Sequence, residues 1–153
     1  MKMRWSSFDE LSPRDVYDLL KLRQEVFIVE QNCVYLDADE LDLEAFHFLG
    51  RDVENALVAY ARVLIRGVKY PEVSIGRVVT SQKTRRSGGG RWLMKNVIEK
   101  IDEFFSDSSQ NSIVPIRISA QSYLVSFYSS FGFTTIGESY LEDDIPHIEM
   151  LRK

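Results

Sequence analysis

Three consecutive glycines, Gly88 to Gly90, are the feature of this sequence that most directly suggests chemistry. Arg85 and Arg86 precede them and Arg91 follows them, although the chain as a whole has a net charge of −4. Glycine lets a ligand approach the backbone closely, and the start of a helix offers unpaired N–H groups with a partial positive charge. We therefore predict an anion site here, with a phosphate group as the ligand. The alternative is a plain flexible turn.

Two well-known phosphate-binding patterns do not fit this stretch. The P-loop pattern G-x-x-x-x-G-K-[ST] is absent, and the dinucleotide pattern G-x-G-x-x-G fails because Leu93 stands where its third glycine belongs. The pattern that remains is R-x-x-G-x-G, formed by Arg85, Gly88 and Gly90.

A strand and a long helix are predicted on the two sides of the glycines. Residues 71–80 (PEVSIGRVVT) read as a strand with a proline at its beginning. Residues 91–105 read as a helix because their apolar residues follow a helical period, namely Trp92, Leu93, Val97, Ile101, Phe104 and Phe105. A third element, a helix over residues 12–31, begins with Ser12 as N-cap and Pro13 at the first helical position.

The remaining elements alternate in a way that indicates a sheet with helices on its faces. A loop is predicted over residues 107–112, and a short helix over 121–131 has Gly132 as its C-cap. Strands are predicted over residues 3–8, 45–50, 56–65, 113–119, 133–141 and 145–153. The order β-α-β-β-β-α-β-α-β-β predicts an α/β (α+β) fold with a mixed sheet, in a single domain spanning residues 1–153.

The composition argues against several classes of protein. A net charge of −4 does not suit a nucleic-acid binder. No apolar run approaches the ~20 residues that cross a bilayer, and the N-terminal residues lack the apolar core of a signal peptide. Cys33 is the single cysteine and there are two histidines, so neither a disulfide nor a Cys/His zinc site is expected. We expect a cytoplasmic protein without nucleic-acid, membrane or metal partners.

The R-x-x-G-x-G spacing resembles the coenzyme A pyrophosphate loop of the GCN5-related N-acetyltransferase (GNAT) superfamily, where this loop follows the fourth strand and opens the third helix. The stretch AQSYLVSFYSSFGF resembles a later motif of that family, a short helix that ends in F-Y-x-x-F-G-F. Together, RQEVFIVEQNCVY, IGRVV, FYSSFGF and IPHIEM resemble the ElaA-type branch. The resemblance covers nearly the whole chain. It implies a largely antiparallel sheet of six to seven strands with a splayed centre, flanked by about four helices.

The loop departs from the family pattern at three positions. Arg86 stands where glycine is frequent, Gly89 where a bulky aliphatic residue is usual, and Gln82 where proline is frequent. The extra glycine makes the loop more flexible, which weakens affinity for the cofactor. None of the three changes removes a backbone N–H group.

The resemblance implies acetyl transfer from acetyl-CoA, bound as a cosubstrate, to a small-molecule or peptide amine. It implies that Val78, Val79 and Thr80 offer main-chain N–H groups to the developing oxyanion, and that Tyr128 protonates the sulfur of coenzyme A. The alternative for Tyr128 is a tyrosine of the core, and Tyr123 is the second choice. The predicted cofactor-binding residues are Val78, Val79, Thr80, Arg85, Arg86, Ser87, Gly88, Gly89, Gly90 and Arg91.

The base that deprotonates the amine is less clear from the sequence. His147 is the main candidate because histidine titrates near neutral pH, and because the family uses this strand near the substrate. Glu149 shares a strand face with His147, and His47 is a further candidate. For both histidines, a packed and hydrogen-bonded side chain is the alternative. Glu30 and Gln31 end the first helix, where they either line the substrate cleft or face solvent.

Several questions stay open at the level of the sequence. The acidic residues of segments 37–44 and 142–144 either attract a cationic amine or belong to solvated loops. Cys33 has no obvious activating neighbour, so direct transfer in a ternary complex is favoured over an acylated cysteine.

The alternative to an enzyme is a non-catalytic acyl-CoA sensor. A serine hydrolase is not favoured because no G-x-S-x-G elbow exists. The oligomeric state is open, with a homodimer through the apolar C-terminal strands as one option.

Overall fold

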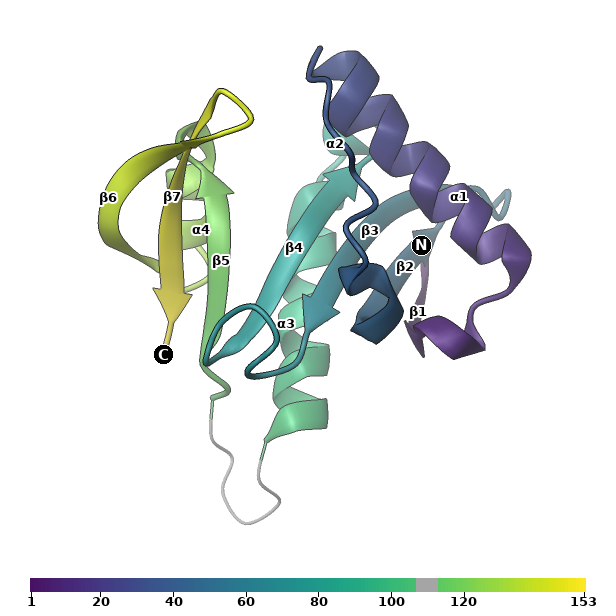
Figure 1. The fold of residues 1–153 in the computed structure, drawn as a ribbon. Helices are drawn as coiled ribbons and strands as arrows, with labels where there is room; N and C mark the ends of the chain where they lie inside the picture. The colour runs from purple at the N-terminus through teal and green to yellow at the C-terminus, as the bar shows by residue number, and fades with distance from the viewer. Residues whose placement is uncertain (107–112) are drawn as a thin grey trace.

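A seven-stranded sheet with the order β1-β2-β3-β4-β5-β7-β6 organises the molecule (Figure 1). This computed structural model describes residues 1–106 and 113–153, so the loop predicted over residues 107–112 lies outside the described residues. Among the described strands, each neighbouring pair is antiparallel except β4 and β5, which are parallel. The predicted mixed, largely antiparallel sheet is therefore confirmed. The strands are β1 (Lys2–Ser7), β2 (Phe46–Arg51), β3 (Leu57–Leu64), β4 (Val73–Thr80), β5 (Ile116–Gln121), β6 (Thr134–Glu142) and β7 (Ile145–Arg152).

Four α-helices lie against this sheet in the described part of the chain, which is the number that the family resemblance implies. They are α1 (Pro13–Arg23), α2 (Gln82–Arg85), α3 (Gly89–Phe105) and α4 (Val125–Ser129). The Ser12 side chain caps α1 by accepting a hydrogen bond from the Asp15 backbone N–H, which confirms the predicted helix start. Gly132 has a φ of +87°, the left-handed conformation that suits the end of α4. The short helix α2 was not predicted.

The first helix differs from the prediction in its second half. The sequence predicts one α-helix over residues 12–31, but α1 ends at Arg23 and continues as a π-helix, η2 (Gln24–Glu30). The Gln31 N–H donates to the carbonyl oxygen of Val26, five residues back, which defines the wider turn. Helical periodicity in the sequence does not distinguish these two windings.

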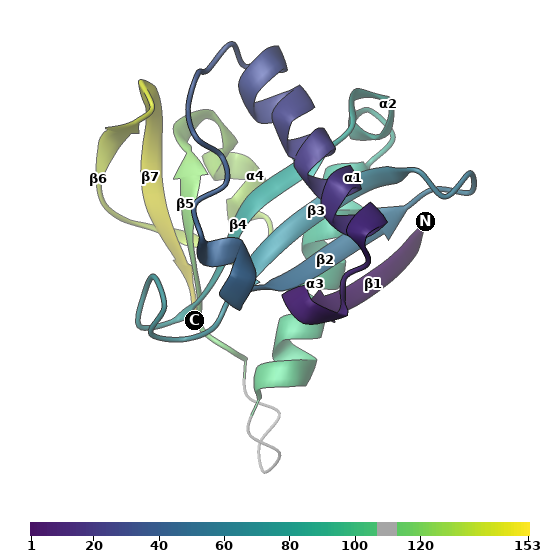
Figure 2. The same cartoon turned by 45° about the vertical axis from the view of Figure 1, so that its right-hand side comes forward.

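Helices cover both faces of the sheet, and alternate residues of each strand point to opposite sides. In β2, Phe48 packs with the core that includes Leu93 of α3, whereas the next residue, Leu49, packs with Leu19 of α1. Figure 2 shows α1 and α3 on opposite faces of the sheet. The larger core lies on the α3 face and includes Tyr128 and residues of β5 and β7.

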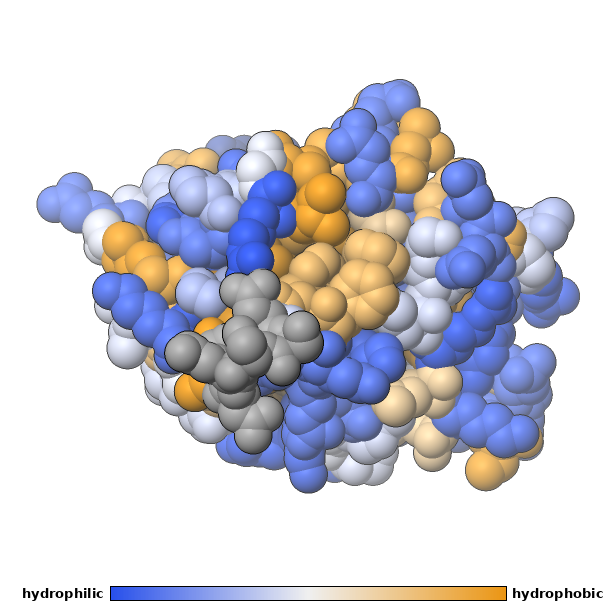
Figure 3. Space-filling view, turned by 90° about the horizontal axis from the view of Figure 1, so that it is seen from below, coloured by the Kyte–Doolittle hydropathy of each residue, from blue (hydrophilic) through white to orange (hydrophobic). Residues whose placement is uncertain are grey.

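The helix α3 begins two residues earlier than predicted and takes in Gly89 and Gly90. At the C-terminal end of α3, aromatic side chains of the helix pack against Trp5 of β1 and Phe46 of β2. The rings of Trp5 and Phe46 stack with centroids 5.0 Å apart. Phe104 packs against both rings, but it is 51% exposed and is therefore not the core residue that its spacing predicts. Figure 3, which views this end of the molecule from below, shows hydrophobic side chains gathered among charged ones.

The sheet opens at its centre. The strands β4 and β5 pair only at Val73 with Ile116 and at Ser74 with Arg117, and they then diverge (Figure 1). Opposite β3, Arg77 and Val78 occupy the space across from Ala61 alone, which is a β-bulge. Arg77 has a φ of +50°, which is rare outside glycine. The predicted splayed centre is confirmed, and it produces the cavity that holds the candidate site.

Candidate functional site

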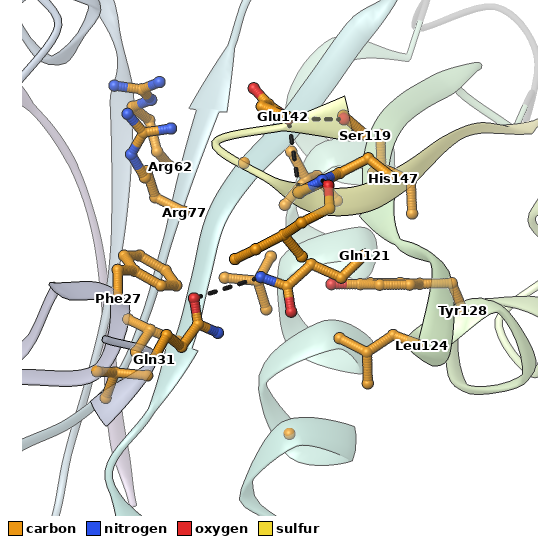
Figure 4. Close-up of a pocket in the computed structure, with 18 of the residues that line it drawn as sticks. Phe27, Gln31, Arg62, Arg77, Ser119, Gln121, Leu124, Tyr128, Glu142 and His147 are labelled. Atoms are coloured by element: carbon orange, nitrogen blue, oxygen red, sulfur yellow. Dashed lines mark hydrogen bonds and ion pairs between the residues drawn. The ribbon is translucent and has the colours of Figure 1, made fainter. Parts of the chain in front are cut away.

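The divergence of β4 and β5 creates a cavity of about 660 Å³ (Figure 4). That volume lies within the ~300–1,000 Å³ typical of sites for small molecules and cofactors. Residues of β4, β5, β7, η2, α4 and the start of α3 line it. Most of the residues predicted from the glycine motif lie here, namely Val78, Val79, Thr80, Arg85, Gly88, Gly90 and Arg91. Arg86, Ser87 and Gly89 are not among the lining residues.

The absence of a side chain has a different consequence at each of the three glycines. Gly88 is the N-cap of α3 and has a φ of +83°, which glycine adopts without steric cost. A Cβ atom on Gly89 would lie 2.3 Å from Thr84 Cγ2 and 2.7 Å from the Thr84 carbonyl oxygen, so only glycine lets α2 and α3 pack this closely. A Cβ on Gly90 would lie at an ordinary contact distance of 3.5 Å from Phe127, so no clash requires glycine there. The missing side chain leaves more open space in the cavity, which both residues line.

The start of α3 is free to bind an anion. No side chain caps it within the described part of the chain, because Gly88 has no side chain to offer. The Trp92 N–H donates to the Gly88 carbonyl oxygen and closes the first turn, which leaves the N–H groups before it without intrahelical partners. Such an end favours a phosphate group through both its N–H donors and its partial positive charge.

Two of the three arginines near this helix start, Arg85 and Arg91, already have partners. Arg85 forms a two-pronged ion pair with the carboxylate of Glu30 in η2, and its Nη2 donates to the Thr80 carbonyl oxygen at 3.1 Å. The hydrogen bond from Arg85 lowers the pKa of Glu30. Arg91 donates to Ser130 Oγ at 3.3 Å and lies over the Phe131 ring. Arg86 is exposed, and Ser87 Oγ donates to the Thr84 carbonyl oxygen.

Tyr128 lies deep in the cavity, and its hydroxyl points toward the Gln121 side chain (Figure 4). The residue as a whole is 7% exposed, and its side chain forms part of the cavity wall. Burial raises the pKa of Tyr128 above its ordinary value, so the phenol keeps its proton at neutral pH. Tyr123, the second choice from the sequence, also lines the cavity but is 75% exposed.

His147 lines another wall of the cavity, in β7. Its Nδ1 lies 2.7 Å from the Ile145 carbonyl oxygen, which can only accept, so Nδ1 carries a hydrogen and donates it. The Nε2 atom lies 3.5 Å from Glu142 Oε2. Tyr140 stacks on the imidazole ring with centroids 6.2 Å apart. In the neutral ring, Nε2 is therefore an unprotonated acceptor, and it lies beside the Glu142 carboxylate, which also lines the cavity.

His47 belongs to the core, not to the cavity. It is fully buried, with Nδ1 2.8 Å from the Tyr60 hydroxyl and Nε2 2.9 Å from the Asp42 carbonyl oxygen. Burial lowers the pKa of His47 and outweighs the opposing effect of Asp42, so the ring stays neutral. The structure thus brings His147, but not His47, to the candidate site.

The acidic segment 37–44 is neither a solvated loop nor a free attractant for a cation. Asp37, Asp39 and Asp42 contact three arginines, namely Arg23, Arg62 and Arg77, at 2.5–3.3 Å. Arg23 is fully buried, and its Nε lies 2.7 Å from Asp37. Burial raises the pKa of Asp42, but the hydrogen bonds and positive charges of Arg23 and Arg62 together outweigh burial and lower it. The network attaches this segment to the β4 bulge, and Tyr35, two residues before the segment, lines the cavity.

The end of the first helix lines the cleft, as one of the two sequence readings held. Gln31 Oε1 accepts a hydrogen bond from Gln121 Nε2 at 3.4 Å, which links η2 to β5 across the cavity (Figure 4).

Cys33 also lines the cavity and is half-buried, with Sγ 3.7 Å from the Asp143 carbonyl oxygen. Glu149 pairs with Arg117 at 2.8 Å and is not a lining residue.

Comparison with known proteins agrees with this geometry. Residues 17–153 match the family model of the acetyltransferase (GNAT) domain. A UPF0039 protein of Synechocystis sp. is 42% identical over 147 residues, which cover 96% of this chain and 92% of the relative. The chain belongs to the GNAT acetyltransferase family. Its resemblance to the ElaA-type branch is also confirmed, because the crystal structure of Escherichia coli ElaA has a TM-score of 0.88 at 40% identity, covering 99% of both chains.

The crystal structure of an acyl-CoA N-acyltransferase from Pseudomonas aeruginosa has a similar fold. It has a TM-score of 0.89 at 37% identity, and the two chains cover each other completely. Within the described residues of the present GNAT chain, no helix is long and apolar enough to cross a membrane. The same residues contain no group of three or more histidine, cysteine or acidic side chains that would hold a metal ion.

Several lining residues of this GNAT protein escaped the sequence reading. Ser119 lines the cavity but belongs to none of the quoted motifs, whereas Gln121 and Arg77 lie within AQSYLVSFYSSFGF and IGRVV but were given no role there. Glu142 was noticed only as part of an acidic turn, although Tyr140 and His147 are register partners in the hairpin. The signal that would have found Glu142 is this hairpin: a turn at residues 143–144 brings Glu142 back toward the imidazole.

Proposed function

We propose that this GNAT protein transfers the acetyl group of acetyl-CoA directly to a primary amine in a ternary complex. One observation carries the proposal: a single cavity joins an uncapped helix start, a buried phenol and a histidine with a free ring nitrogen. The helix start suits the pyrophosphate of coenzyme A, with the N–H groups of Gly88–Arg91 as donors. The other two groups suit the proton transfers that amine acetylation requires.

The roles divide between three sets of residues. The free edge of β4 at Val78–Thr80 offers main-chain N–H groups for the oxyanion that forms when the amine nitrogen attacks the thioester carbon. His147 Nε2 takes a proton from the amine. Tyr128 gives its proton to the sulfur as the C–S bond breaks. An ammonium acceptor loses two protons in all, of which one balances the proton given to sulfur and the other is released to solvent.

Direct transfer is favoured over an acylated Cys33. The Cys33 Sγ lies against the Asp143 carbonyl oxygen, a hydrogen-bond acceptor that does not remove the thiol proton. Tyr128 and His147 line the same cavity. An acid for the thiolate and a base for the amine are therefore both available, and the reaction does not need a cysteine as an intermediate nucleophile.

The test compares two phenol variants. In Tyr128→Phe, turnover with acetyl-CoA and an amine is expected to fall by about 10²-fold, since general acid catalysis contributes at least this much. The affinity for coenzyme A, measured by isothermal titration calorimetry, is expected to stay within about twofold. Tyr123→Phe is the matched control because that exposed phenol borders the same cavity. If Tyr123→Phe loses turnover and Tyr128→Phe does not, the acid has been assigned to the wrong tyrosine.

A further inference from the structure

Three carboxylates of the described residues line the cavity, namely Glu30, Glu142 and Asp143. Glu30 is neutralised by Arg85. Glu142 differs, because within residues 1–106 and 113–153 no lysine or arginine lies within ion-pair distance of it. Its Oε2 atom instead lies 3.5 Å from His147 Nε2 and accepts a hydrogen bond from Ser119 Oγ at 3.3 Å. A carboxylate that contacts a histidine but no described lysine or arginine is therefore present in a cavity where a cationic acceptor would bind.

The hydrogen positions at this pair leave room for a donor. Because Nδ1 of His147 donates to the Ile145 carbonyl oxygen, the neutral ring presents a lone pair at Nε2. The Glu142 carboxylate is also an acceptor, so with the ring in its neutral state two acceptors face each other at 3.5 Å. An ammonium group carries three hydrogens and satisfies both acceptors at once.

The surrounding side chains hold these two acceptors in place. The Tyr140 ring stacks on His147, and the Tyr140 hydroxyl forms a hydrogen bond with Ser119 Oγ. The His147 side chain is 11% exposed, whereas that of Glu142 is 44% exposed. The imidazole is therefore fixed, while the carboxylate remains accessible to an incoming ligand.

We propose that Glu142 receives the ammonium group of the acceptor and places its nitrogen beside His147 Nε2. This inference rests on the proposed function and narrows its substrate class to alkyl amines that are cationic at neutral pH. One N–H of the ammonium donates to Glu142, and a second transfers its proton to His147. The imidazolium that results is next to the same carboxylate, which stabilises it, and the nitrogen gains the lone pair that attacks the thioester.

The experiment uses two acceptors that differ in charge. Glu142→Gln is expected to raise the KM for a primary alkyl amine by about 10- to 100-fold, the range for losing a charged hydrogen bond. The KM for methoxyamine, which is uncharged at pH 7, is expected to change by less than about threefold. Calorimetric affinity for coenzyme A stays the same. Glu142→Asp, which keeps the charge, is expected to recover part of the loss.

Two further variants test whether the position of the charge matters. Glu138→Gln removes an exposed carboxylate from the same strand outside the cavity and is expected to leave both KM values unchanged. Asp143→Asn removes the neighbouring charge and is expected to have a smaller effect than Glu142→Gln. An equal rise for both acceptors in Glu142→Gln, or an equal effect of Asp143→Asn, would overturn the assignment.

Failure of the proposed function is distinguishable from failure of this inference. If the wild-type protein acetylates no amine, the proposed function is wrong, but ammonium binding is still measurable. Butylammonium is then titrated into the protein loaded with coenzyme A, for the wild type and for Glu142→Gln. Weaker binding to the variant supports the role of Glu142, and equal binding contradicts it.

Discussion

Tyr128 and His147 reach one cavity from different elements, and each is prepared for its proposed task by its surroundings. The phenol is buried in the cavity wall, and burial raises its pKa, so it holds a proton for donation. The imidazole has one nitrogen bonded to a main-chain carbonyl, so the other nitrogen is left to accept. These properties come from local contacts, which a sequence motif does not reveal.

A change at His147 tests the proposed base. Glutamine keeps a polar group there but cannot take up a proton. In His147→Gln, kcat/KM for a primary amine at pH 7 is expected to fall by about 10²-fold, the lower contribution of a general base. The deficit is expected to shrink as pH rises toward 10, because more of the amine is then already deprotonated. A rate equal to the wild type at pH 7 would show that the base lies elsewhere.

At the scale of elements, the glycine loop joins α2 to α3, and residues of both this loop and the β4 bulge line the cavity. The bulge is built on Arg77 in a left-handed conformation, with its guanidinium bonded to Asp37. The loop exposes the N–H groups at the start of α3, and the bulge lies on the part of β4 that is not paired with β5. The two features together shape a site for an extended ligand with an anionic end.

Substitution of two adjacent glycines by alanine is expected to have opposite effects on stability. In Gly89→Ala, the new Cβ would lie 2.3 Å from Thr84 Cγ2, and overpacking of this kind costs about 1–3 kcal/mol. In Gly90→Ala, the contact with Phe127 is ordinary and helix propensity improves by up to about 1 kcal/mol. Urea denaturation is expected to show a lower free energy of unfolding for the first variant and an equal or higher one for the second. A loss of similar size in both variants would mean that Thr84 is not the constraint.

At the scale of the whole molecule, charged side chains connect segments that are far apart in the sequence. Asp15 in α1 contacts Arg4 of β1 at 2.7 Å and Arg51 of β2 at 2.8 Å, and it also bonds to Ser12. Burial raises the pKa of Asp15, but the hydrogen bonds from Ser12 and Arg51 outweigh burial and lower it from 3.8 to about 2. The ionised carboxylate therefore stabilises the folded state.

The stabilisation by Asp15 is expected to depend on pH. Since the folded-state pKa is below the ordinary one, the contribution is complete above about pH 4–5 and disappears as pH falls toward 2. Asp15→Asn is expected to lower the free energy of unfolding by about 2 kcal/mol at pH 7, from a shift of nearly two pKa units. The difference from the wild type should vanish near pH 2. Asp9→Asn, at an exposed site, is the control, and a loss at Asp15 that does not depend on pH would contradict the account.

The sequence predicts most of the architecture because strands and long helices leave periodic patterns. The order of the seven strands and the start of α1 were predicted correctly, whereas the helix α2 was missed and two of the three glycines lie inside α3. Three features were not predictable from local patterns. The π-helix shares its apolar spacing with an α-helix, the bulge requires a positive φ at Arg77, and the aspartates of segment 37–44 are buried only because distant arginines neutralise them.

The central claim is that this GNAT protein acetylates an amine with acetyl-CoA. The most direct measurement incubates the wild-type chain with acetyl-CoA and a panel of primary amines, while thiol release and product mass are followed together. We expect at least one alkyl amine to gain an acetyl group in a one-to-one ratio with the free thiol of coenzyme A. If acetyl-CoA binds but no amine in the panel is acetylated, the protein is a sensor of acyl-CoA and the claim is wrong.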